Sequence, residues 1–123
     1  MTRYTITVLG FLLAFGMASL ATADMKGGEK DVSVTGEVVD TFCYSAMGAK
    51  GTGHKQCGID CAKKGIPVGL LEKGTDNIHI LLPTKDKTAL PDEVVNKMGE
   101  TATITGHQYK KGGVAFLKVE SVK

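Results

Sequence analysis

The chain has 123 residues, of which 42% are hydrophobic and 23% charged, with a formal net charge of +2 at neutral pH. This length predicts one small domain with a modest core, which must be aliphatic because there is no Trp and only 6% of residues are aromatic. So small a net charge excludes a general polyanion-binding surface, and we expect no nucleic-acid partner.

The N-terminal segment, residues 1–23, has the pattern of a secretory signal peptide. A basic residue precedes an apolar run over 6–20, and residues 21–23 read Ala-Thr-Ala, the small-residue pattern of a cleavage site. The run is short for a membrane span, so we expect a periplasmic or secreted protein with no membrane span after signal cleavage. Residues 24–30 are then a flexible lead-in, and residues 31–123 form a single domain.

The first half of this domain reads as a strand followed by a long insertion. Alternating valines predict a strand over 31–40, with Gly36 as a bend or bulge. The glycines that follow predict a loop up to about Gln56. A short helix is expected over 57–64, ended by Gly65.

The second half alternates short strands with one helix. Apolar runs predict strands over 68–72 and 78–82, separated by a polar turn. A helix is expected over 91–98, with its proline at the first helical position and acidic residues in the first turn. Strands over 101–108 and 114–122 surround a Gly-Gly hairpin turn.

This order predicts a mainly β fold. It is a five-stranded OB-like barrel with one helix between strands 3 and 4, and an inserted Cys/His loop plus short helix. The pattern V-x-G-x-V-V-D at Val34–Asp40 and the pattern T-x-T-G-x-x within Thr103–Tyr109 resemble those of small exported bacterial OB-fold proteins. The resemblance implies a barrel that presents a binding surface, without assigning a ligand to it.

All three cysteines fall in the insertion, together with a histidine, in the spacing C-x10-H-x2-C-x3-C: Cys43, His54, Cys57 and Cys61. Three thiolates and an imidazole suit tetrahedral zinc, and two or three thiolates suit copper(I). On a helix, Cys57 and Cys61 share one face, and we expect Cys43 to approach from the end of the first strand. The sequence therefore predicts a non-catalytic copper or zinc site.

A disulfide is the main alternative to a metal. Pairing Cys43 with Cys57 or Cys61 would brace the insertion against the barrel and stabilise the fold by about 3 kcal/mol. The protein would then be a binding or adaptor module whose partner is another periplasmic protein. Since the number of cysteines is odd, one thiol would remain, which also allows thiol redox chemistry. The identity of the metal, the partner and the oligomeric state stay open.

A methionine and two lysines near the cysteines also have predicted roles. Met47 is a soft thioether that can complete a copper site or pack under the loop. We expect Lys55 and Lys63 to lower the thiol pKa values by their charge.

Two further histidines lie on predicted strands. His79 stands between two isoleucines, and we expect it to be exposed on the opposite face. His107 and Tyr109 are two residues apart and share a strand face. The haem chaperone of cytochrome c maturation also pairs a His with a Tyr on an exported OB-fold, so haem is an alternative ligand here.

Overall fold

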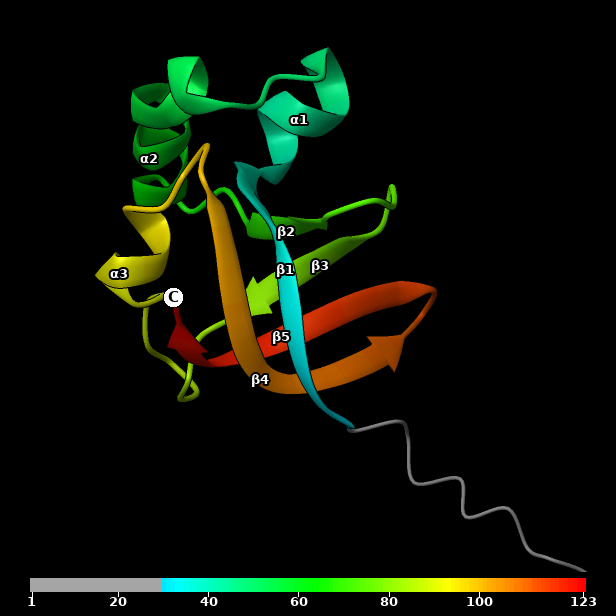
Figure 1. The fold of residues 1–123 in the computed structure, drawn as a ribbon. Helices are drawn as coiled ribbons and strands as arrows, with labels where there is room; N and C mark the ends of the chain where they lie inside the picture. The colour runs from blue at the N-terminus through cyan, green and yellow to red at the C-terminus, as the bar shows by residue number, and fades with distance from the viewer. Residues whose placement is uncertain (1–29) are drawn as a thin grey trace, which may run out of the picture.

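The computed structural model describes residues 30–123, so the predicted signal peptide and all but the last residue of the lead-in lie outside it. The described chain is mainly β, and its five strands close into a barrel in the order β1-β2-β3-β5-β4 (Figure 1). The strands are β1 (Lys30–Asp40), β2 (Val68–Glu72), β3 (Ile78–Leu82), β4 (Thr101–Lys111) and β5 (Val114–Val122). The prediction of a five-stranded barrel is confirmed.

The long strand β1 pairs with two neighbouring strands of the barrel. Its first part pairs with β4 and its last part with β2, both antiparallel, while β3 and β5 pair in parallel and close the barrel. Gly36 and Glu37 pair with both neighbours at once. A Cβ on Gly36 would overlap the carbonyl oxygen of Leu71, so the glycine is required by the close approach of β2.

Residues 30–123 also form four helical segments: α1 (Thr41–Met47), the 3-10 turn η1 (Thr52–His54), α2 (Lys55–Lys63) and α3 (Asp92–Val95). Helices α1 and α2 lie together at one end of the barrel (Figure 1). The prediction of a loop up to Gln56 is therefore wrong, and α2 begins two residues before the expected position. The glycines that suggested a loop lie at helix ends, since Gly48 is the left-handed C-cap of α1 and Gly51 is the N-cap of η1.

Helix α3 is shorter than expected. Pro91 has extended backbone and is the N-cap rather than the first helical residue. Beyond the helix the chain turns back to β1, where Met98 forms a bridge with Val38 and the N–H of Gly99 donates to the carbonyl of Val38 at 2.8 Å. Gly99 has a φ of +72°, which this turn requires and which L side chains rarely adopt. The contact with β1 thus ends the helix early.

An aliphatic core fills the barrel, as the composition predicted. Leu70, Ile104 and Leu117 are fully buried, and Ile59 of α2 and Val94 of α3 belong to the same cluster. Both helices are thereby fixed to the barrel by burial of apolar surface. Within residues 30–123, no helix has the length and apolar character needed to cross a membrane.

Replacing Gly106 by alanine is expected to destabilise the fold by about 2 kcal/mol. The register of β4 and β5 shifts between Thr105 and Gly106, and a Cβ at Gly106 would overlap the carbonyl oxygen of Lys118. Urea unfolding measures the effect. The matched control is Gly53→Ala, since a Cβ at Gly53 meets no atom within 4 Å. Equal stabilities of the two variants would contradict this account of the bulge.

Candidate metal centre

Cys43 lies in the first turn of α1, not at the end of β1 as predicted. The side chain of Asp40 caps this helix, with Oδ1 accepting from the N–H of Cys43 at 2.8 Å. The cap fixes where the helix begins, and Cys43 as a whole residue is only 5% exposed. Cys43 is therefore held rigidly against the barrel end.

His54 reaches the same carboxylate from the other side of the insertion. It ends η1, and its Nε2 lies 2.8 Å from Asp40 Oδ2. Since a carboxylate accepts, Nε2 is the protonated ring nitrogen. Asp40 is 1% exposed, so one buried carboxylate connects the Cys43 helix to the His54 ring.

Helix α2 carries the other two cysteines one turn apart. Gly58 lies between them and packs so closely on Met98 that a Cβ would come within 2.9 Å of the Met98 sulfur. The buried Ile59 holds the same helix face against the core. This packing leaves Cys57 exposed and Cys61 half-buried at the barrel end.

The four residues predicted as ligands fall into two overlapping groups of side chains that lie close together. Possible ligand atoms of Cys43, His54 and Cys57 all lie within 4.8 Å of one another, and so do those of Asp40, Cys43 and Cys61. Cys43 is common to both groups and forms the centre of the cluster. All three cysteines are free thiols in the structure, so the possible disulfide is not formed there.

Asp40 is the member of the cluster that the sequence analysis missed. Burial opposes its ionisation, but the backbone N–H of Cys43 and the ring of His54 outweigh this and hold the pKa of Asp40 below its ordinary value. It is thus a carboxylate at neutral pH. An Asp that directly precedes a helix is the one sequence signal that could have identified it.

The pKa values of two of the thiols are raised, whereas we expected them to be lowered. Burial and the neighbouring Asp40 carboxylate raise the pKa of Cys43 to about 12, and burial followed by the same charge raises that of Cys61. The expected lowering by Lys55 and Lys63 is wrong for these two thiols. Lys55 instead forms an ion pair with Glu100, whose pKa it lowers. A metal must therefore displace protons from Cys43 and Cys61 to bind them.

Most other candidates lie elsewhere. Met47 is 66% exposed on α1. His107 lies between two carboxylates, in an ion pair with Asp31 and with its Nε2 2.9 Å from Glu120 Oε1. Acidic side chains thus face both ring nitrogens of His107, an arrangement that does not favour haem ligation.

The prediction that His79 is exposed is wrong, because it is only 4% exposed. Along β3 the buried positions are His79 and Leu81, whereas Ile78 and Ile80 are only partly buried. Since the IHILL run is apolar on both faces, its pattern could not reveal which face is turned inward.

Comparison with known proteins gives no relative from which a function could be transferred. No model of a known protein family matches the chain, and neither does any curated protein or solved structure. The function must therefore be inferred from the chemistry of the cluster itself.

Proposed function

We propose that this is an exported OB-fold protein that binds a soft transition metal, copper or zinc, through Cys43, His54, Cys57 and Cys61, without catalysing a reaction. The observation that carries the proposal is the convergence of these side chains from α1, η1 and α2 on one end of the barrel. Thiolate sulfur and imidazole nitrogen are the donors that zinc and copper(I) prefer.

The OB assignment is supported by the order of the elements. The barrel order β1-β2-β3-β5-β4, the parallel pair β3 and β5, and a helix between β3 and β4 suit a five-stranded Greek-key barrel. Export is supported by the sequence of residues 1–23. In an exported protein, thiols tend to be oxidised or bound by a metal, and a metal site here would account for all three.

Asp40 would orient the histidine for the metal. Its hydrogen bond from His54 Nε2 leaves Nδ1 as the ring nitrogen available for coordination, the arrangement found where a carboxylate supports a metal-binding histidine. The same carboxylate caps the helix of Cys43. One side chain would thereby position two ligands.

The centre is closed on the barrel side and open on the solvent side. Cys43 is buried, whereas Cys57 is exposed. Structural zinc sites are usually closed, and a ligand open to solvent can be approached by an incoming donor. We therefore favour an exchangeable metal, as in a protein that carries or buffers it.

The alternative is an adaptor module braced by a disulfide. It is favoured by one observation, that the sulfur of Cys43 lies within 4.8 Å of the sulfurs of both Cys57 and Cys61. Oxidation of Cys43 with either one would leave the other as a single thiol.

Elemental analysis and thiol titration of protein purified from its native compartment distinguish the two. We expect one copper or zinc per chain, with all three thiols becoming reactive only after the metal is removed by a chelator. Protein that binds neither copper(I) nor zinc after anaerobic reduction and reconstitution would rule out the metal site. One reactive thiol in the absence of metal would support the adaptor.

A further inference from the structure

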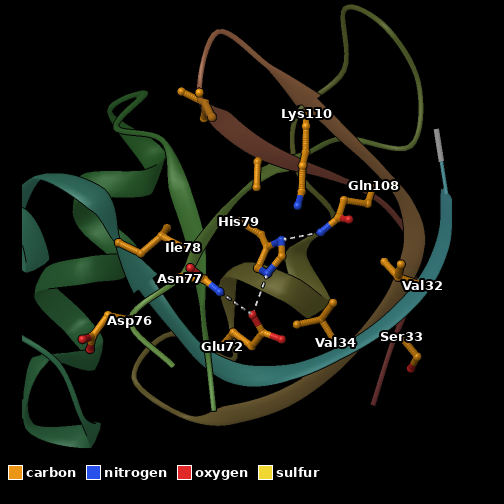
Figure 2. A pocket seen from close by; sticks show the side chains of 13 residues that line it. Val32, Ser33, Val34, Glu72, Asp76, Asn77, Ile78, His79, Gln108 and Lys110 are labelled. Carbon is orange, nitrogen blue, oxygen red and sulfur yellow. Dashed lines mark hydrogen bonds and ion pairs between the residues drawn. The ribbon is translucent and has the colours of Figure 1, made fainter. Parts of the chain in front are cut away.

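A cavity of about 690 Å³ lies between the β2–β3 turn and the β4–β5 hairpin (Figure 2). Its lining residues come from all five strands and from these two connections, and none comes from the segment 41–67 that carries the cysteines. The volume is in the range of small-molecule sites. The cavity is therefore separate from the candidate metal centre.

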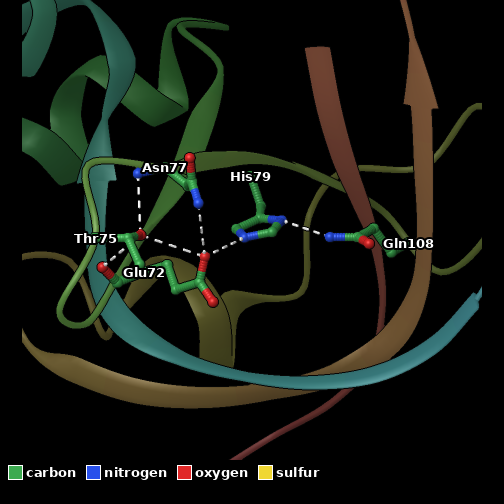
Figure 3. Close-up of polar contacts among 5 residues, drawn as sticks. All are labelled: Glu72, Thr75, Asn77, His79 and Gln108. Carbon is green, nitrogen blue, oxygen red and sulfur yellow. Dashed lines mark hydrogen bonds and ion pairs between the residues drawn. The ribbon is translucent and has the colours of Figure 1, made fainter. Parts of the chain in front are cut away.

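A chain of polar side chains with the buried His79 at its centre crosses this cavity. His79 Nε2 donates to Glu72 Oε2 at 3.4 Å, and the amide of Gln108 donates to His79 Nδ1 at 3.2 Å (Figure 3). Asn77 and Thr75 donate to the same oxygen of Glu72, each at 3.3 Å. Hydrogen bonds from Asn77 and His79 hold the pKa of Glu72 below its ordinary value. The network fixes the His79 ring beside a carboxylate, next to the aliphatic core of the barrel.

Lys110 and Glu72, which carry opposite charges, line the same cavity without forming an ion pair with each other. The side chain of Lys110 points inward toward His79 and Gln108 (Figure 2), and no carboxylate of residues 30–123 lies within 4.0 Å of its ammonium group. On the acidic side, the three donors all reach Oε2 of Glu72, so Oε1 takes part in none of these bonds. Asp76 lines the same cavity. Among residues 30–123, an ammonium group with no carboxylate partner and a carboxylate with one oxygen outside this network thus line the same cavity.

The wall of the cavity also has an apolar part. Its side chains are aliphatic and come from the three strands β1, β3 and β5: Val32, Val34, Ile78, Val114 and Ala115. Val114 is 40% exposed, which makes it one of the few exposed large hydrophobic residues in the described chain. A ligand that fits this surface has an apolar body and two opposite charges.

We infer that this cavity binds a short peptide with free termini and aliphatic side chains. The ammonium terminus lies on Glu72 Oε1, the carboxylate terminus lies on Lys110, and the aliphatic side chains cover the valines. A dipeptide suits the site better than a free amino acid because Glu72 and Lys110 are not in ion-pair contact, and the His79 ring lies between them (Figure 2). The binding does not depend on a metal.

Titration of the purified protein with L-leucyl-L-leucine, followed by the NMR signals of the His79 ring, tests this inference. We expect the dipeptide to shift these signals in a saturable way. Acetylation of its N-terminus or amidation of its C-terminus should each weaken binding about tenfold or more, because each removes one charge-assisted hydrogen bond. No binding up to the solubility limit, or equal binding of the dipeptide and its two blocked forms, would overturn the inference.

Two substitutions test where the two termini of the dipeptide bind. Lys110→Met should weaken binding of leucyl-leucine about tenfold, while the amidated dipeptide should be unaffected by it. The control is Lys111→Met, since Lys111 is also exposed but does not line the cavity. Glu72→Gln should affect the acetylated dipeptide least, with Glu93→Gln on α3 as its control. If Lys110→Met and Lys111→Met bind the dipeptide equally well, the carboxylate terminus is not on Lys110 and the inference fails.

Discussion

Replacing Cys43 by serine is expected to lower metal affinity about 100- to 1000-fold. This factor corresponds to one quarter of the binding free energy of a zinc site with four ligands. The single substitutions Cys57→Ser and Cys61→Ser should lower it less. The reason is geometric, since Cys43 belongs to both groups of converging ligand atoms, whereas Cys57 and Cys61 belong to one each.

Competition with a chelator of known affinity measures these differences, for zinc and for copper(I) separately. Because Cys43 is buried, Cys43→Ala is made in parallel, and thermal unfolding of both variants shows whether they fold. Ser45→Ala is the control on the same helix, since Ser45 is exposed. A folded Cys43 variant with wild-type affinity would exclude Cys43 as a ligand.

The barrel was predictable because its strands are runs of β-branched and aliphatic residues between strong turn signals. β2, β3 and β5 have the bounds that the sequence predicted. Helix α1 was not predictable in the same way, because glycines dominate the composition of the insertion and their positions at helix ends are apparent only in the structure. The length of α3 depends on a contact between Met98 and β1, which no local pattern encodes.

The clustering of the cysteines and His54 could be predicted from the sequence, whereas the electrostatics of the cluster could not. Cysteine and histidine are rare enough that their concentration in one segment indicates a site. The direction of a thiol pKa shift depends on burial and on the nearest charge, and the nearest charge to Cys43 is the carboxylate of Asp40 rather than a lysine. Likewise, the exposure of His79 depends on which face of β3 is turned into the barrel, a property of the whole sheet.

Replacing Asp40 by alanine is expected to destabilise the metal-free protein by about 3 kcal/mol and to lower metal affinity about 10- to 100-fold. The loss of stability has two parts. The first turn of α1 loses its cap, and the buried N–H of Cys43 and the ring of His54 lose their common acceptor. Urea unfolding and chelator competition measure the two effects.

Asp40→Asn separates the cap from the charge. The side-chain oxygen of asparagine can still accept from the N–H of Cys43, so most of the stability should return, whereas support of His54 by a carboxylate is lost. Metal affinity should therefore stay low in this variant. If Asp40→Asn restores both stability and affinity, the negative charge has no role in the centre and Asp40 is only a helix cap.

The pH dependence of stability gives an independent measure of that charge. Because the pKa of Asp40 is lower in the folded protein than its ordinary value of 3.8, its contribution to stability is complete above that value. The contribution is lost as the pH falls through the folded-state pKa. Metal-free wild type should thus lose stability relative to Asp40→Asn across this acidic range, and parallel curves would show that the carboxylate contributes nothing by being ionised.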